Sequence, residues 1–257
     1  MLLLTPPQTA TLRDRFLPDW PGPLVGLHVI QTGHGACFAD RWPAPRALLT
    51  ATAGNYAFTG DPAALVPADL QGRISGFVDA PAPFVPLLHA AFPAVTVWER
   101  VMLELAARPV VAAPSGFHLQ RLEAADAYLL WGLSPDLTWI AKTWGGPPGL
   151  AASGTAWGAF AGERLVAVAC PFFVGVGYED LGVVTEPAFR GLGLSGACAS
   201  AVCGDILDRG RRPSWTTATD NRASLRVAEK LGFVQRRQDR LYIVGIAVPA
   251  PPRRAGR

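Results

Sequence analysis

The chain has 257 residues, half of them apolar, and a formal net charge of only +3. This length allows one large domain or two small ones around a sizeable core, and the lack of a basic block excludes a typical nucleic-acid-binding surface. No apolar run is long enough to cross a membrane, so we expect neither nucleic acid nor a membrane as a partner.

The cysteines are spread along the chain without any C-x-x-C spacing, at Cys37, Cys170, Cys198 and Cys203. This pattern predicts reduced, buried thiols in a cytoplasmic protein rather than a disulfide framework. The spacing of His34 and Cys37 could provide half of a metal site. No second pair of ligands follows in the sequence, so we expect no metal.

Residues 1–112 are rich in proline and show little helical periodicity. Segments 24–30 and 47–52 predict strands, whereas 86–92 and 97–105 predict two short helices, or a helix and a strand. We expect these elements to form a smaller N-terminal α/β domain. Its boundary at residue 112 follows from two prolines and a glycine that interrupt the chain over 108–116.

Strands and helices alternate beyond the boundary. Strands are predicted at 117–122, 156–160, 165–173, 178–185, 214–219 and 241–248, and helices at 124–131, 135–143, 194–209 and 222–231. Ser134 and Asn221 are the expected caps of the second and fourth helices. This order predicts an α/β fold, a mixed sheet with helices on both faces, over 113–248, followed by a flexible tail at 249–257.

The turn between the strand at 178–185 and the helix at 194–209 carries the clearest chemical signal. It reads Arg190-Gly191-Leu192-Gly193-Leu194-Ser195 and leads into a run of small residues. Glycine lets the backbone approach a ligand without a Cβ in the way. A strand, a glycine-rich turn and a helix in this order direct main-chain N–H groups toward one point at the positive end of the helix. The turn is therefore suited to phosphate.

A second segment, N-R-A-S-L-R-V-A-E-K-L-G-F at 221–233, follows at a suitable distance. Together the two segments resemble the GNAT superfamily of acetyl-CoA-dependent N-acyltransferases, whose fingerprint is Q/R-x-x-G-x-G/A. Arg190, Gly193 and Ser195 take the fingerprint positions, with serine in place of the usual glycine or alanine. The segments P-A-F-R-G at 187–191 and F-T-G-D at 58–61 also resemble the subgroup typified by the zwittermicin-resistance acetyltransferase.

The resemblance implies a GNAT fold in the C-terminal part and acetyl-CoA as the cofactor. In that fold the fourth strand splays from the fifth, and the cofactor arm pairs with the exposed backbone. One strand N–H would then polarise the thioester carbonyl. The implied cofactor contacts are Val183, Val184, Thr185, Arg190, Gly191, Leu192, Gly193, Leu194, Ser195, Asn221 and Ser224.

Two acids, Glu179 and Asp180, lie near the implied thioester site, and either could take the proton that the amine loses. We favour Asp180, which aligns with the acidic position of the subgroup. Many members of the family use a tyrosine to reprotonate the departing thiolate, but Ala228 stands at that position. Ser224 is the substitute candidate.

These features predict an N-acetyltransferase that moves an acetyl group from acetyl-CoA to a primary amine of an unidentified small molecule, by direct attack in a ternary complex. We expect residues before 113 to wall the acceptor side, and we allow for a homodimer. The missing tyrosine leaves open a non-catalytic acyl-CoA-binding or sensor protein. A dinucleotide-binding protein is the other alternative, because residues 191–196 also fit G-x-G-x-x-G and Asp220 follows downstream.

Overall fold

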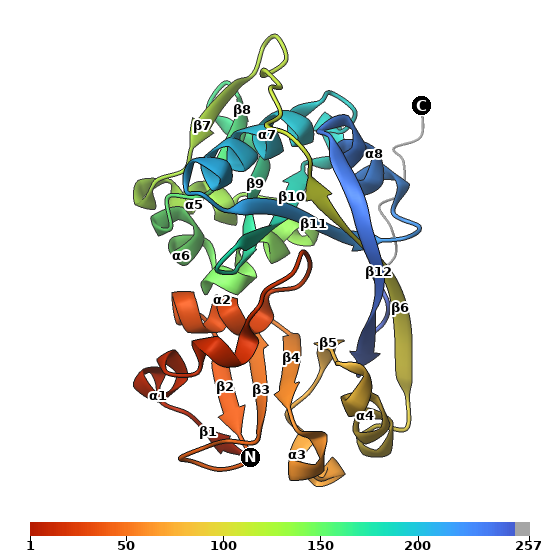
Figure 1. Cartoon of the computed structure of the whole chain (residues 1–257). Coiled ribbons are helices and arrows are strands. Elements are labelled where there is room, and N and C mark those ends of the chain that lie inside the picture. Colours follow the sequence, from red (N-terminus) through yellow and green to blue (C-terminus); the bar gives the residue numbers. More distant parts are fainter. Residues whose placement is uncertain (250–257) are drawn as a thin grey trace.

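The structure is a computed structural model that describes residues 1–249. Its strands join into one twelve-stranded mixed sheet with helices on both faces (Figure 1), which confirms the predicted α/β fold. All of the predicted tail except Pro249 lies outside the described residues.

The strands alternate with short connections along the chain. They are β1 (Leu2–Leu3), β2 (Ala36–Ala39), β3 (Ala47–Thr52), β4 (Asn55–Gly60), β5 (Gly76–Asp79), β6 (Val95–Leu105), β7 (His118–Arg121), β8 (Trp157–Ala161), β9 (Arg164–Val174), β10 (Tyr178–Thr185), β11 (Arg212–Ala218) and β12 (Phe233–Val244).

Most helices are short, and several begin with proline at a position where its missing N–H costs no hydrogen bond. The α-helices are α1 (Pro6–Ala10), α2 (Val25–Thr32), α3 (Pro67–Leu70), α4 (Val85–Ala91), α5 (Ala127–Trp131), α6 (Pro147–Ala152), α7 (Leu194–Asp208) and α8 (Arg222–Lys230). The 3₁₀ helices are η1 (Arg13–Phe16), η2 (Pro62–Ala64), η3 (Ala82–Phe84), η4 (Ala124–Asp126), η5 (Pro135–Trp144) and η6 (Pro187–Phe189).

The strand order is symmetric about the central pair: β1-β2-β3-β4-β5-β12-β6-β11-β10-β9-β8-β7. On each side an antiparallel pair, β3–β4 or β9–β10, is followed by a parallel neighbour, β5 or β11. We call β1–β5 with β12 the N-terminal half, and β7–β11 with β6 the C-terminal half. The β4–β5 and β10–β11 pairs are the only parallel pairs among the described strands, so the sheet is not the mostly parallel sheet of a dinucleotide-binding fold.

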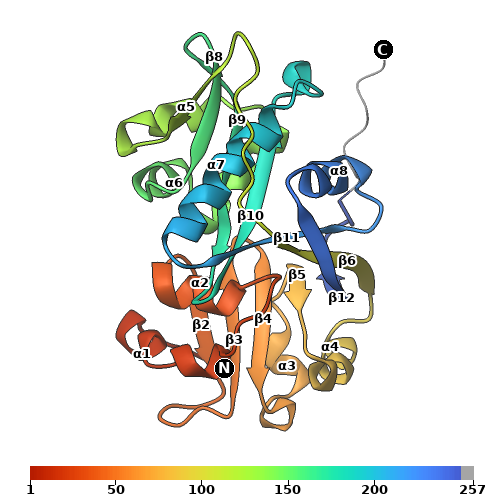
Figure 2. The same cartoon turned by 45° about the horizontal axis from the view of Figure 1, so that its top comes forward.

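The two halves exchange their last strands. β6 follows β5 in the chain but pairs with β11, and β12 follows β11 but pairs with β5. β6 and β12 also pair with each other along most of their length, where they run side by side (Figure 2). The proposed boundary at residue 112 falls between β6 and β7, so residues 1–112 supply a strand to the C-terminal half.

Several predicted elements differ from the structure. Residues 24–30, predicted as a strand, form most of helix α2, whose residues Val25–Val29 are all buried. Apolar side chains all around a helix leave no 3.6-residue periodicity, so the segment resembles a buried strand. β12 begins at Phe233 rather than 241 because its first part is polar and exposed. For 86–92 and 97–105 the structure has the second of the two predicted alternatives, a helix (α4) and a strand (β6).

Helix α7 packs closely against the sheet because much of its inner face consists of small residues. Ala197, Cys198, Ala199 and Cys203 are fully buried against β9 and β10, together with side chains of α8. A separate core lies on the opposite face, beneath α5, α6 and η5. Odd-numbered residues of β10 such as Leu181 face α7, and even-numbered ones such as Val184 face the second core.

Candidate active site

Strands β10 and β11 pair only where they begin. Tyr178–Asp180 lie opposite Arg212–Ser214 in parallel register. Beyond Asp180, β10 stays paired with β9 and β11 with β6, but the described chain has no further pairing between β10 and β11. The two strands diverge in the middle of the sheet, as Figure 2 shows where β11 turns away from β10. This divergence leaves one edge of β10 free to pair with an extended ligand.

Strand alternation determines which backbone groups of β10 face this gap. The N–H of Glu186 donates to the carbonyl oxygen of Val166 next to β9 (2.8 Å), whereas the carbonyl of Gly177 accepts from Arg212 of β11 (2.8 Å). The backbone N–H and C=O groups of even-numbered residues therefore bond toward β9, and the backbone groups of Val183 and Thr185 face the gap. The backbone groups of Val184 bond to β9. Val184 was predicted as a cofactor contact, but these groups do not face the gap.

The glycine turn forms an open cradle at the start of α7. Gly191 and Gly193 have φ values of +83° and +86°, which residues with a Cβ rarely adopt. The six consecutive N–H groups of residues 191–196 have no acceptor within residues 1–249. A hydrogen bond of 2.8 Å between Thr185 Oγ1 and Ser195 Oγ fixes the turn to the end of β10. Such a row of free donors at the positive end of a helix suits the oxygens of a diphosphate.

Asp180 lies at the last paired position, where the strands begin to diverge. Its side chain accepts hydrogen bonds from Ser214 Oγ (2.8 Å) and Thr216 Oγ1 (2.9 Å) of β11, and the residue is only 4% exposed. Burial raises the pKa of the Asp180 carboxyl to about 7, although both hydroxyl donors and nearby Arg100 favour the charged form. At neutral pH this group is present in both its ionised and protonated forms, so it can accept a proton or release one.

Arg100 of β6 faces Asp180, and no motif in the sequence indicated it. Its guanidinium lies 4.1 Å from the ring centroid of Trp98 and donates from Nη2 to the carbonyl oxygen of Thr216 (3.3 Å). Its buried Nε has no hydrogen-bond partner among the described residues. Burial lowers the Arg100 pKa to about 10, whereas Asp180 and Asp220 favour the charged form. The predicted boundary at residue 112 assigns Arg100 to the N-terminal domain. Arg100 lies beside Asp180 because β6 pairs with β11 of the C-terminal half.

Glu179, the other candidate acid, lies on the opposite face of β10. Its carboxylate pairs with Arg209 (2.7 Å) and Arg211 (2.8 Å), and its side chain is 1% exposed. The structure therefore does not bring Glu179 and Asp180 together. The contacts of Glu179 tie β10 to the segment that leads into β11.

Helix α8 places Asn221 and Ser224 beside β11. Asn221 Oδ1 accepts from the N–H of Ser224 (3.2 Å), which confirms its predicted capping role. Ser224 Oγ accepts from the indole Nε1 of Trp215 (2.9 Å), so its own hydroxyl hydrogen remains free to donate. Ala228 is fully buried in the core. The other predicted cap, Ser134, has no capping side-chain bond and instead donates from Oγ to Glu186 (2.6 Å).

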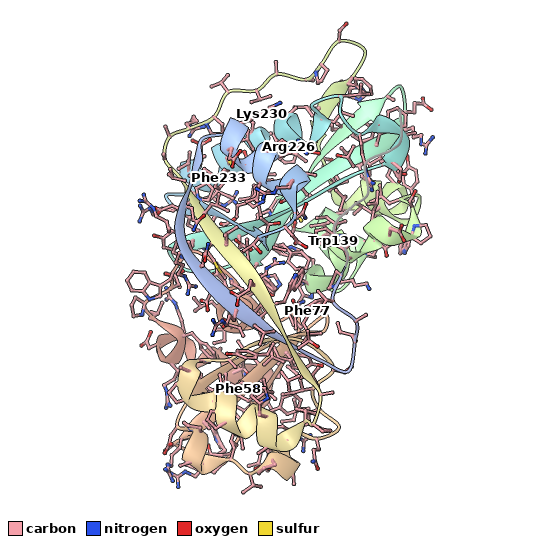
Figure 3. All side chains as sticks on the ribbon, turned by 90° about the vertical axis from the view of Figure 1, so that its right-hand side faces the viewer. Phe58, Phe77, Trp139, Arg226, Lys230 and Phe233 are labelled. Carbon is pink, nitrogen blue, oxygen red and sulfur yellow. The ribbon has the colours of Figure 1, made fainter. Side chains whose placement is uncertain are left out.

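An aromatic wall adjoins Asp180 on the same face of β10. Gly182 lies two residues further along, and a Cβ there would be 3.1 Å from Cβ of Phe172, the extra residue of a bulge in β9. The ring of Phe172 packs edge-on against Trp139, with a centroid distance of 5.3 Å. In Figure 3, Trp139 of the C-terminal half and Phe77 of the N-terminal half lie on either side of the boundary between the halves.

In the part of the chain that the structure describes, no cluster of three or more histidine, cysteine, aspartate and glutamate side chains could hold a metal ion. The described helices include none that is long and apolar enough to span a membrane.

Comparison with known proteins indicates one family throughout. The family model described as GNAT acetyltransferase matches residues 15–242. An uncharacterised N-acetyltransferase of Streptomyces virginiae is 40% identical over 213 residues, which cover 81% of this chain and 90% of the relative. An uncharacterised N-acetyltransferase of Bacillus subtilis is 21% identical over 261 residues, which cover 94% and 98% of the two chains.

Solved structures share the fold at low sequence identity. A GCN5-related N-acetyltransferase-like protein from Streptococcus suis matches with a TM-score of 0.67 and 18% identity, covering 92% of this chain and 98% of the other. A tandem GNAT protein from the clavulanic acid biosynthesis pathway matches with a TM-score of 0.56 and 15% identity, covering 93% of both chains. These likenesses extend over both halves of the sheet.

Proposed function

The chain belongs to the GNAT acetyltransferase family, and from its geometry we propose that it moves an acetyl group from acetyl-CoA to a primary amine of a small molecule. The observation that carries this proposal is the divergence of β10 from β11 with the buried carboxyl of Asp180 at its apex. The gap offers free backbone to a cofactor arm, and the carboxyl offers a proton acceptor beside it.

The chain's donors fit acetyl-CoA, which supplies an activated acetyl thioester when bound. The free N–H groups of residues 191–196 would hold the diphosphate, assisted by the side chain of Arg190. The backbone of Val183 and Thr185 would pair with the arm, and Asn221 and Ser224 border its far side. The N–H of Val183 would stabilise negative charge on the thioester oxygen, an interaction typically worth about 10²–10³ in rate.

Asp180 would take the proton that the amine loses as its nitrogen attacks the acetyl carbon, directly or through water. Its raised pKa, about 7, suits this role at neutral pH. We leave Glu179 out of the chemistry because two arginines occupy its carboxylate. Ser224 can donate its hydroxyl hydrogen to the departing sulfur, which leaves as a thiolate with modest help.

Transfer would occur by direct attack in a ternary complex rather than through an acylated cysteine. All four cysteines are free and buried, and burial raises the pKa of Cys37 to about 11 and that of Cys198 to about 12. The pKa values of Cys170 and Cys203 are raised in the same way. Protonated, buried thiols are poor nucleophiles. They are also consistent with the cytoplasmic location that we propose.

The resemblance to the zwittermicin-resistance subgroup suggests an amino-containing metabolite or antibiotic as the acceptor. Purified protein mixed with acetyl-CoA and a panel of amines should release thiol, and CoA should quench its tryptophan fluorescence. CoA binding without thiol release from any amine would favour the acyl-CoA sensor instead. Binding of NAD but not CoA would overturn the cofactor assignment.

A further inference from the structure

A cavity of about 640 Å³ lies beside the proposed reaction site. It is lined by Trp20, Pro21, Glu104, Tyr178, Arg212, Arg236 and Arg237. Trp20 and Pro21 come from the loop that follows η1, and the other residues come from the four strands at the centre of the sheet. The N-terminal half therefore closes over residues of the C-terminal half at this point.

Strand register places this cavity on the same face of the sheet as Asp180. Tyr178 lies two residues before Asp180 on β10, so both side chains project to one face. Arg212 is the register partner of Tyr178, and Glu104 is that of Ser214, which bonds Asp180. Two residues of strand span about 7 Å. The cavity thus begins about 7 Å along β10 from Asp180.

The arginines of the cavity keep unused hydrogen-bond donors. The buried carboxylate of Glu104 pairs with both Arg212 and Arg236, the latter at 2.9 Å from Nε. A second carboxylate, that of Asp19, accepts from the backbone N–H groups of residues 176–178 beside Tyr178. Arg237 adds no free positive charge, because its own partner is Asp239. The terminal nitrogens of Arg236 have no hydrogen-bond acceptor within residues 1–249, so they are free to bind an anion.

The remaining lining makes the cavity selective rather than merely basic. The hydroxyl oxygen of Tyr178 accepts from Arg212 Nη1 (2.7 Å), and the guanidinium of Arg212 lies 5.2 Å from the Tyr178 ring centroid. Arg212 is therefore held in place before any ligand arrives. Trp20 adds an aromatic surface that is 64% exposed. A ligand here would meet fixed cationic donors on one side and an apolar wall on the other.

We propose that this cavity receives an oxyanion of the acceptor, so that the substrate is an amine that also carries a carboxylate or phosphate group. This inference rests on the proposed acetyl transfer. The amine would lie at Asp180 and the oxyanion at Arg236 and Arg212. Opposite charges at the two ends of the site would orient the amine toward the thioester.

The test compares acceptors that differ only in the anionic group. Thiol release from acetyl-CoA is measured with 5-aminopentanoate and with its neutral amide, and with phosphoethanolamine and ethanolamine to separate phosphate from carboxylate. We expect kcat/KM to be at least about 10-fold higher for the anionic member of one pair, as a charged hydrogen-bonded contact typically gives. Equal kcat/KM within both pairs would overturn the inference while leaving the acetyltransferase assignment intact.

The matched variants are Arg236→Gln and Arg240→Gln, both on β12. Arg236→Gln leaves Arg212 to neutralise Glu104, and we expect it to abolish the preference for the anionic acceptor. Arg240 pairs with Glu99 outside this cavity, so Arg240→Gln should keep the preference. A preference that survives Arg236→Gln would contradict the assignment of the cavity.

A binding measurement separates this inference from the proposed function. Protein saturated with CoA is titrated with 5-aminopentanoate or its amide while tryptophan fluorescence is followed, and Trp20→Phe identifies the signal from the cavity. Selective binding of the carboxylate that Arg236→Gln removes would support the cavity even if no thiol were released. Absence of selective binding by either the carboxylate or phosphoethanolamine would overturn it.

Discussion

His28 of α2 lies 2.8 Å, Nε2 to O, from the carbonyl oxygen of Thr143 in η5, and thereby joins the two halves of the molecule. Its Nδ1 accepts from the N–H of Val174 at the end of β9 (3.2 Å), so Nε2 must carry the hydrogen and the ring is neutral. The side chain is fully buried, and this burial lowers the pKa of His28 to about 4. Protonation would remove the acceptor and place a charge in the core.

This contact should make the fold acid-sensitive. Because the folded pKa of His28 lies below its unfolded value of about 6.5, its contribution is fully present above pH 6.5 and is lost as pH falls toward 4. The loss amounts to about 3 kcal/mol. Urea unfolding at pH 7 and pH 4.5 measures it. His28→Gln should flatten the difference, and His89→Gln, at an exposed site on α4, should not. An unchanged pH dependence in His28→Gln would contradict the assignment.

Asp180→Asn should lower kcat/KM by about 10²–10⁴, the usual worth of a general base. In the wild type, kcat/KM should rise with pH through about 7 as the carboxyl ionises, and the variant should lose this limb. A pH–rate profile from thiol release provides the measurement. Glu179→Gln is not a neutral control, because it would leave Arg209 and Arg211 without their carboxylate.

The same substitution has a stability signature. A carboxyl whose folded pKa is raised to about 7 contributes stability that is fully present below its unfolded pKa of about 3.9 and is lost as pH rises from there through 7. Asp180→Asn should therefore unfold at a higher temperature than the wild type above pH 7, with the gain shrinking toward pH 4. A gain that is the same at both pH values would argue against a raised pKa at Asp180.

Gly193→Ala should weaken CoA binding. A Cβ at φ of +86° costs roughly 1–2 kcal/mol, and relief of this strain would turn the donors of the cradle. Gly162→Ala is the matched control, because Gly162 also has a positive φ with open space around it but lies in the β8–β9 hairpin. Both variants should lose stability, whereas calorimetric titration with CoA should show a raised Kd only for Gly193→Ala.

Ser224→Ala should lower kcat less than Asp180→Asn does, because a CoA thiolate leaves with little assistance. It should also cost about 1 kcal/mol of stability, since the Trp215 indole loses its acceptor. Single-turnover rates with saturating acetyl-CoA measure the first effect and urea unfolding the second. A normal turnover rate in a destabilised variant would limit Ser224 to a structural role.

A fragment spanning 113–257 should not fold alone, although the boundary at 112 lies in an irregular segment. It lacks β6, which pairs with both β11 and β12 in the intact chain. Unpaired central strands expose their backbone and aggregate. Expression followed by circular dichroism checks this expectation. Adding residues 95–112 should restore solubility only in part, because β12 would still lack β5.

The sequence was most informative where chemistry constrains a short segment. The turn at 190–195, the Asn221 cap and the order of elements from β8 to α8 could all be predicted, because each depends on local patterns of glycine, capping residues and alternation. The acidity of Asp180 could not, because it arises from burial and from hydroxyl groups on another strand.

Contacts between distant segments explain the other differences. Helix α2 lies in the angle between the halves, next to β3, β4 and β9, so the burial of its whole circumference could not be predicted from its own residues. Arg100 reaches the site only because β6 crosses into the other half of the sheet. Long-range pairing of this kind leaves no periodic signal in the sequence.

The exchange of β6 and β12 also has a consequence for biosynthesis. The N-terminal half cannot complete its sheet until β12, which is translated after the other described strands, has left the ribosome. Until then β6 and β5 present open edges that a chaperone or a neighbouring nascent chain could occupy. We therefore expect emergence of β12, rather than emergence of residue 112, to trigger cooperative formation of both halves at once.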